Sequence, residues 1–337
     1  MSKVRLGPGR VGRVLLVAAA FAGCNGAATA VTGATSSGEP TGSGGAASTT
    51  SATGDPPCMG EACGCPACTA VDLDCLGLVD NSGKTRFGLR ISDLAVSKPA
   101  VLASGLVATA LATSVSLPNK GCFIDGSGAF SWLLRFDTVA GTLETGGARP
   151  VADPTLGYGF LDEMLNGIQV QPVVSMAAID PGTGAFSVAA GADLALPIFL
   201  DPAGTTSFVL PLTGARLAMG TLSASRSCIG HIDVPDPGST FCLGKHAQYT
   251  TGASVDGVIG LEAADASRIV ATNQSLCALL AGQANSENDA NGFKVCKRDA
   301  NMKILFQGDA CSTPGQACGD AVAFAADYVA SSVLIND

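Results

Sequence analysis

The stretch Ala129–Val139, "AFSWLLRFDTV", decides the expected fold. Its apolar residues alternate with smaller or polar ones, which places Phe130, Trp132, Leu134 and Phe136 on one side of an extended chain. Strict alternation is typical of a β-strand with one face toward a core, because successive side chains of a strand point to opposite faces. The run contains the only tryptophan of the chain, so it predicts a core strand.

The segments around this strand have the same period. "RFGLRISDLAV" (86–96) places Phe87, Leu89 and Ile91 on one face, and similar runs continue to about residue 260. Turn signals separate them: "DPTLGYG", "DPGTGA", "DPAGTT" and "VPDPGST". Short alternating strands joined by such turns predict a mainly β fold, an antiparallel β-sandwich with jelly-roll-like or barrel-like character.

Two later segments depart from simple alternation. In "EAADASRIVATNQSLCALLAGQ" (262–283) apolar residues recur at helical spacing, which predicts one or two short helices divided near Asn273. The tail "DAVAFAADYVASSVLIND" (320–337) allows a helix or a strand, and the alternation of Val322, Phe324, Ala326 and Tyr328 favours a closing strand.

The amino-terminal segment has the pattern of an export signal. Four basic residues precede a nine-residue apolar run, Val14–Ala22, which is too short to cross a bilayer as a helix. The end of this run and the two residues after it, Phe21-Ala22-Gly23-Cys24, resemble the lipobox of bacterial lipoproteins, with Phe21 in place of the usual Leu. The resemblance implies cleavage before Cys24, lipidation of Cys24 and a location in the bacterial cell envelope, anchored to a membrane by the lipid.

Composition suggests how the rest of the chain is organised. Residues 1–23 are the predicted signal peptide, and 24–57 the lipidated cysteine with a flexible linker rich in Gly, Ser, Thr and Ala. Residues 58–80 form a cysteine-rich stapled segment, and 81–337 a β-rich domain with a helical insertion at about 263–283. This composition resembles that of cysteine-rich, tethered bacterial lipoproteins, a likeness that transfers no residue role.

The cysteine count agrees with an oxidising compartment. Apart from Cys24, twelve cysteines remain, and an even number in an exported chain predicts disulfides. Pairing of sequence neighbours is the expectation for the second half of the chain: Cys228–Cys242, Cys277–Cys296 and Cys311–Cys318. The other six candidates are Cys58, Cys63, Cys65, Cys68, Cys75 and Cys122.

Two patterns raise the question of a metal. Cys228, His231, Cys242 and His246 have spacings that suit a tetrahedral zinc site, although a Cys228–Cys242 disulfide explains the same cysteines. The loop "NSENDANG" contains Glu287, Asp289, Asn291 and Gly292 in a calcium-like order, but Arg298 stands where an EF-hand requires glutamate. A weak calcium site from Asp233 and Asp236 is the other alternative. The expectation is no cofactor.

Charge and missing motifs narrow the expected function. The chain carries 28 acidic against 19 basic residues, which argues against binding nucleic acid. No nucleophile or zinc-protease motif occurs, and no catalytic residue is assigned. The sequence therefore predicts a binding or structural protein of the cell envelope that contacts a glycan, a surface polymer or another envelope protein. The alternative is a carbohydrate-active hydrolase with paired carboxylates, for which Asp162 and Glu163 are candidates.

Overall fold

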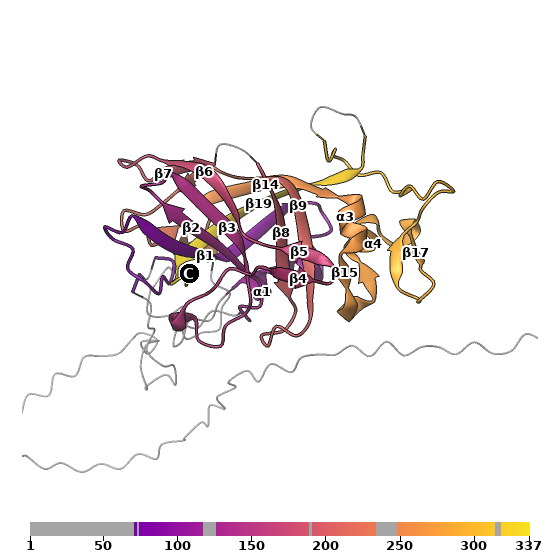
Figure 1. Cartoon of the computed structure of the whole chain (residues 1–337), viewed down its shortest axis with the longest axis horizontal. Coiled ribbons are helices and arrows are strands. Elements are labelled where there is room, and N and C mark those ends of the chain that lie inside the picture. The colour runs from indigo at the N-terminus through magenta and orange to yellow at the C-terminus, as the bar shows by residue number, and fades with distance from the viewer. Residues whose placement is uncertain (1–70, 73, 117–125, 189–190, 234–247, 314–317) are drawn as a thin grey trace, which may run out of the picture. The chain divides into compact units, whose positions relative to one another are not determined.

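The stretch around Trp132 lies at the centre of a large antiparallel sheet (Figure 1). The computed structural model describes residues 71–337, except 73, 117–125, 189–190, 234–247 and 314–317. In this part of the chain, eleven strands join in one sheet, which confirms the mainly β, antiparallel prediction. The central pair is β1 (Arg86–Lys98) and β2 (Ser131–Asp137), in which Leu89 is paired with Leu134.

The strand order is β10-β7-β6-β3-β2-β1-β19-β14-β9-β8, and the short β11 pairs with β19 beside this path. All of these neighbours are antiparallel. The remaining strands of the sheet are β3 (Thr142–Ala148), β6 (Val173–Ile179), β7 (Ala185–Val188), β8 (Ala192–Phe199), β9 (Ser207–Ala218), β10 (Gly220–Thr221), β11 (Cys228–Ile229), β14 (Ala253–Gly260) and β19 (Ala321–Ser332). The closing strand predicted for the tail is confirmed, and it occupies the centre of the sheet between β1 and β14.

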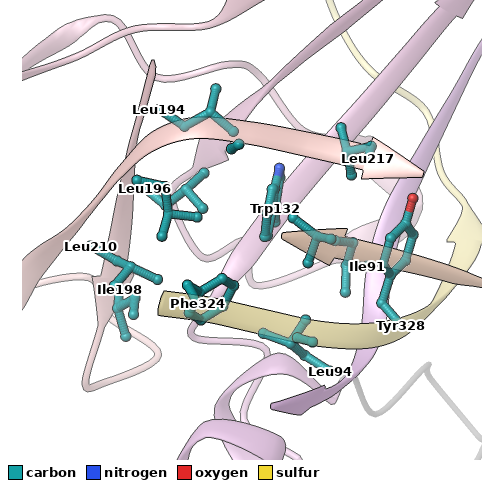
Figure 2. Close-up of a cluster of buried hydrophobic side chains, with 14 of the residues drawn as sticks. Ile91, Leu94, Trp132, Leu194, Leu196, Ile198, Leu210, Leu217, Phe324 and Tyr328 are labelled. Carbon is teal, nitrogen blue, oxygen red and sulfur yellow. The ribbon is translucent and has the colours of Figure 1, made fainter. Parts of the chain in front are cut away.

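The sheet curls so that β8 packs near β3, although the two strands are far apart in the strand order. The two layers of the predicted sandwich are thus two halves of one curled sheet. The main core fills the space between them, and Figure 2 shows Trp132 among side chains from both halves, including Leu196 and Ile91. Trp132 donates its indole N–H to the Thr145 hydroxyl at 2.8 Å, so its polar atom is satisfied. Burial of a large apolar side chain contributes about 1.5–3 kcal/mol.

The opposite side of the central strands is covered as well. Arg90 on β1 and Leu133 on β2 point away from the main core and are buried. Residues 71–81 and the segment around Tyr158 pack over this outer face, with Val333 among the buried contacts. The alternation of the sequence predicts only one covered face, whereas the structure buries both.

Two of the helices, α3 and α4, lie at one end of the sheet, together with a small four-stranded sheet ordered β15-β16-β18-β17 (Figure 1). The predicted insertion is confirmed as two short helices, with Asn273 in the left-handed conformation between them. These elements are α3 (Leu261–Ala266), β15 (Arg268–Ile269), η3 (Val270–Thr272), β16 (Gln274–Ser275), α4 (Leu276–Ala281), η4 (Gln283–Asn285), β17 (Ser286–Asn288) and β18 (Lys294–Cys296). Outside both sheets lie the hairpins β4 (Glu163–Leu165) with β5 (Ile168–Val170) and β12 (His231–Asp233) with β13 (Gln248–Thr250), and the single turn η2 (Pro154–Leu156).

One helix was not expected. The sequence predicts strands throughout residues 84–260, but α1 spans Gly105–Val115. A signal for it exists, because Val107, Leu111 and Val115 recur every four residues and are buried or half-buried in the structure. Abundant Val and Thr, which favour strands, obscure this helical spacing.

The predicted Asp-Pro turns are held by their aspartates. Asp180 accepts hydrogen bonds from the backbone N–H groups of Thr183 and Gly182, and Asp201 accepts them from Thr205 and Thr206. These bonds stabilise the charged carboxylate and lower the pKa of both aspartates. Part of the acidic composition is therefore explained by turn formation. The fourth predicted turn, at 234–240, lies outside the described residues.

Candidate functional site

Three disulfides are present in the described part of the chain, and they support two of the predicted pairings. Cys277 pairs with Cys296, and Cys311 pairs with Cys318, as expected. The prediction Cys228–Cys242 is wrong, because Cys228 pairs with Cys75 across 153 positions of sequence. Sequence proximity fails here because the fold lays residues 71–81 on the outer face, next to β11. The other predicted cysteines, Cys24, Cys58, Cys63, Cys65, Cys68, Cys122 and Cys242, lie outside the described residues.

The Cys75–Cys228 disulfide also bears on the zinc hypothesis. A zinc site needs Cys228 as a thiolate, but its sulfur is bonded to Cys75. Of the other three ligands in that set, His231 begins β12, whereas Cys242 and His246 lie outside the described residues. The set Cys228, His231, Cys242 and His246 is therefore not proposed as a metal site.

The acidic loop considered for calcium is a closed turn. One oxygen of Asp289 accepts the backbone N–H groups of Asn291 and Phe293, and the other pairs with Arg268 at 3.2 Å. These bonds lower the pKa of Asp289 and use the oxygens that a cation would need. The candidate acids of the hydrolase reading are also engaged, since Asp162 accepts from Gln169 and Glu163 pairs with Arg149.

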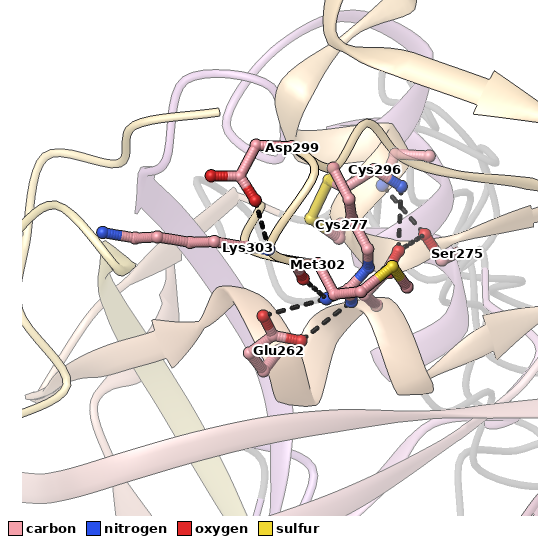
Figure 3. A network of polar contacts seen from close by, with 10 residues as sticks. Glu262, Ser275, Cys277, Cys296, Asp299, Met302 and Lys303 are labelled. Carbon is pink, nitrogen blue, oxygen red and sulfur yellow. Dashed lines mark hydrogen bonds and ion pairs between the residues drawn. A yellow bond between two sulfur atoms is a disulfide. The ribbon is translucent and has the colours of Figure 1, made fainter. Parts of the chain in front are cut away.

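A second polar cluster surrounds the Cys277–Cys296 disulfide (Figure 3). Buried Asp265 accepts from Ser275 at 2.8 Å and from the backbone N–H of Cys296 at 2.9 Å, and it also pairs with Arg298. Glu262 and Asp265 together hold the Arg298 guanidinium and raise its pKa. The two carboxylates, the Ser275 hydroxyl and the Arg298 guanidinium are thus bonded within the helical region, so the cluster stabilises that region.

The strongest site candidate is an open cleft of about 710 Å³ between β10, β12, β13, β14 and β19. Its polar lining consists of two carboxylates, one imidazole and several hydroxyls: Asp74, Asp327, His231, Thr221, Ser223, Thr250, Thr251 and Ser254. Among the described lining residues there is no Lys, Arg, Phe, Tyr or Trp. The cleft therefore presents negative charge and hydrogen-bonding groups, without an aromatic surface for stacking.

The fold positions these side chains from segments far apart in sequence. Asp327 projects from β19 opposite Ser254 on β14. Asp74 precedes the cysteine that joins residues 71–81 to β11, and its carbonyl accepts the backbone N–H of Ile232 at 2.6 Å. The disulfide and this bond bring Asp74 to the same cleft as His231.

The floor of the cleft depends on glycine. Gly230 has a φ of 70°, a conformation that residues with a Cβ rarely adopt. A Cβ on Gly252 would lie 2.0 Å from the Gly230 nitrogen. The two backbone segments therefore approach this closely only because both residues lack side chains.

A serine nucleophile is not arranged in this cleft. Ser223 lines the cleft, and its hydroxyl oxygen accepts the backbone N–H groups of Cys228 at 3.0 Å and Ser227 at 3.2 Å. Activation would require His231 to take the proton from this hydroxyl, and no such bond is present among the described residues. The arrangement suits binding through charge and hydrogen bonds.

No family model, curated protein or solved structure matches the chain. None of the helices in the described ranges has the length and apolar character that crossing a bilayer requires. Any functional conclusion therefore depends on the sequence patterns and on the cleft.

Sequence reasoning did not identify the cleft. It named His231 only as a candidate zinc ligand and passed over Asp74 and Asp327, because neither lies in a local motif. Only the pairing of β19 with β14 and the Cys75–Cys228 disulfide bring the two carboxylates to one cleft.

Proposed function

We propose that this protein is an exported lipoprotein of the bacterial cell envelope whose β-rich head binds another envelope protein. The basic residues, short apolar run and Cys24 support export and lipidation, although these residues lie outside the described part of the chain. The three disulfides support an oxidising compartment.

The open acidic cleft is the observation that carries the binding role. Asp74 and Asp327 attract a cation, and the surrounding threonine hydroxyls and glycine backbone offer hydrogen bonds to a polypeptide main chain. A volume of 710 Å³ accommodates several residues in extended conformation. The ligand that fits best is an extended segment of an envelope protein that carries Lys or Arg.

A glycan fits less well. Sugar rings commonly stack on aromatic side chains, and the described lining has no Phe, Tyr or Trp. Hydrolysis of a glycan is the second candidate, favoured by the one observation that two carboxylates share the cleft.

The test compares the full chain with Asp74→Asn and Asp327→Asn. Binding of a library of lysine-containing and arginine-containing peptides is measured by fluorescence anisotropy at low and physiological salt. We expect each substitution to weaken binding about tenfold, as loss of one charge-assisted contact does, and added salt to weaken it further. Glu287→Gln, which removes an exposed carboxylate on β17 away from the cleft, is the matched control.

Three outcomes distinguish the peptide-binding hypothesis from the hydrolase hypothesis. The proposal is supported if Asp74→Asn and Asp327→Asn both reduce peptide binding and Glu287→Gln leaves it unchanged. Cleavage of an envelope polysaccharide that either Asn variant abolishes would replace it with the hydrolase. Equal peptide binding by all variants would refute the cleft as the binding site.

Lipidation is tested separately, in cells supplied with labelled palmitate. The full chain should incorporate label and partition with membranes, and Cys24→Ser should do neither. Label incorporation that is the same in Cys24→Ser would exclude Cys24 as the anchor.

A further inference from the structure

A second and chemically opposite site lies beneath α1. Here the structure contains a largely enclosed cavity of about 50 Å³ in which every lining residue is apolar. Its walls come from α1, β1, β8, β9, α4 and β19, and include Val107, Leu111, Ile198, Leu276 and Phe324. Figure 2 shows Ile198 and Phe324 within the same group of inward-facing side chains. No part of this cavity belongs to the acidic cleft.

The cavity is small in the state shown. An engineered apolar cavity that admits benzene measures about 150 Å³, three times this volume. A ligand larger than a few carbon atoms therefore requires one wall to move. An apolar, narrow site of this kind selects a single hydrocarbon chain, because it offers no hydrogen bond to a polar group.

One wall of the cavity, α1, is held at its carboxyl-terminal end, where the carbonyls of Thr113 and Ser114 accept the backbone N–H groups of Ser127 and Phe130. Among the described elements it packs chiefly against one strand, β1. It has eleven residues and no charged residue, and the Ser104 hydroxyl donates to the Ala100 carbonyl at 2.8 Å instead of capping the N–H groups of the first turn. Helices of this length are marginal unless tertiary packing stabilises them.

Side-chain hydrogen bonds weaken α1 further. Thr109 donates to the Gly105 carbonyl at 3.2 Å and Ser114 to the Ala110 carbonyl at 2.8 Å, contacts that slightly destabilise and bend a helix. Several of its apolar side chains, including Val107 and Leu111, are only partly buried. Outward movement of the amino-terminal part of α1, with its carboxyl-terminal end as the hinge, leaves the backbone bonds at that end in place. A hydrocarbon chain would cover the apolar surface that this movement exposes.

From these observations we infer that α1 is a movable lid over a binding site for one hydrocarbon chain, as carried by a monoacyl amphiphile such as a fatty acid. This inference does not depend on the proposed peptide-binding cleft. If the cleft hypothesis fails, the cavity and its lid are unchanged.

The experiment measures binding of the fluorescent fatty acid cis-parinaric acid to the delipidated full chain. Trp132 is the only tryptophan, so energy transfer from it to the probe reports binding near the main core. Saturable 1:1 binding is expected. Saturated fatty acids should displace the probe with affinities that rise about fourfold for each added methylene, whereas diacyl phospholipid vesicles should not displace it.

Two adjacent positions of α1 provide the variants. Leu111 lines the cavity, and Ala110 is exposed. Leu111→Phe fills the cavity and should weaken binding at least about tenfold, while Ala110→Phe should leave it unchanged. Leu111→Ala enlarges the cavity and should tighten binding, and it serves as the second readout if thermal unfolding shows that Leu111→Phe does not fold.

The inference is overturned if the wild-type chain shows no saturable binding. It is also overturned if Leu111→Ala binds no tighter than the wild type, or if a folded Leu111→Phe variant binds as tightly as Ala110→Phe.

Discussion

The central strands β1, β2 and β19 are buried on both sides, and the two sides are stabilised differently. The inner face is apolar and continuous, with Phe87, Leu89, Trp132, Leu134 and Phe136 in one cluster. Two ring pairs reinforce it: Phe136 stacks on Phe87 at 5.3 Å and meets Phe186 edge-on at 5.1 Å. The stability of this face is therefore distributed over many apolar contacts.

The outer face depends on a few specific interactions. Its covering segment, residues 71–81, is fixed by the Cys75–Cys228 disulfide and by bonds such as that from the Leu78 N–H to the Ser332 carbonyl. Arg90 is completely buried there and bonds to Ser131 and to the carbonyls of Ile91 and Phe130. Its guanidinium lies over the Tyr158 ring at 5.8 Å, and in the described part of the chain it forms no ion pair. Burial of this charge lowers the pKa of Arg90.

One sheet can therefore have two buried faces of different kinds. An apolar sequence pattern specifies the inner face, whereas a disulfide and individual hydrogen bonds specify the outer face. Substitutions on the inner face should have costs that follow the volume removed. On the outer face, the loss in free energy of unfolding should depend on which bond the substitution removes.

The largest effect is expected for Trp132→Ala on the inner face. Loss of the indole leaves a cavity and removes the hydrogen bond to Thr145, whose hydroxyl still donates to the Leu133 carbonyl, so the free energy of unfolding should fall by about 3–5 kcal/mol. Denaturant unfolding followed by circular dichroism measures it. Val139→Ala, at a site where the valine is 80% exposed, is the control and should change stability little. Equal effects of the two would contradict the assignment of Trp132 to the core.

Removal of the outer-face disulfide should follow in size. Cys75→Ser with Cys228→Ser should lower the free energy of unfolding by about 2–4 kcal/mol, because the disulfide closes a long loop of the unfolded chain. The matched pair Cys311→Ser with Cys318→Ser opens a loop between residues only seven positions apart and should cost less. Limited proteolysis should then cut residues 71–81 first in the Cys75 variant. If residues 71–81 of this variant resist proteolysis, the disulfide is not what holds this segment on the outer face.

A smaller effect is expected for Arg90→Met. The substitution keeps most of the side-chain volume but leaves Ser131 and the Phe130 carbonyl without their partner, at a cost of about 1–3 kcal/mol. Arg216→Met is the control, because Arg216 forms an exposed pair with Asp256 at 2.9 Å, and such pairs contribute about 0–1 kcal/mol. An Arg90→Met variant as stable as the wild type would mean that burial of the charge offsets its hydrogen bonds.

The smallest effect concerns the turns outside both faces and depends on pH. The folded-state pKa of Asp180 and Asp201 is lowered by hydrogen bonds to their carboxylates. Their contribution is therefore present above the unfolded pKa of about 3.9 and is lost as the pH falls through the folded pKa. In Asp180→Asn and Asp201→Asn the loss of stability between neutral pH and about pH 2 should be less steep than in the wild type. Thermal unfolding across this range, with Glu287→Gln as reference, checks the slope.

The sequence by itself determined the strands, their inward faces and most of the turns. The reason is physical: the alternation around Trp132, the Asp-Pro turns and the helical spacing of residues 262–283 are local properties, set by backbone geometry and by the period of burial. Export and lipidation are also predicted from a local pattern, and they stay predictions.

Tertiary structure alone decided what covers the outer face, which cysteine pairs with Cys75, and which side chains share a cleft. Asp74 and Asp327 are 253 positions apart and meet because the carboxyl-terminal strand enters the middle of the sheet. The cavity beneath α1 likewise arises only where β1, β8, α4 and β19 converge. Contacts between distant segments depend on strand order and on the curl of the sheet, and no local period in the sequence encodes either.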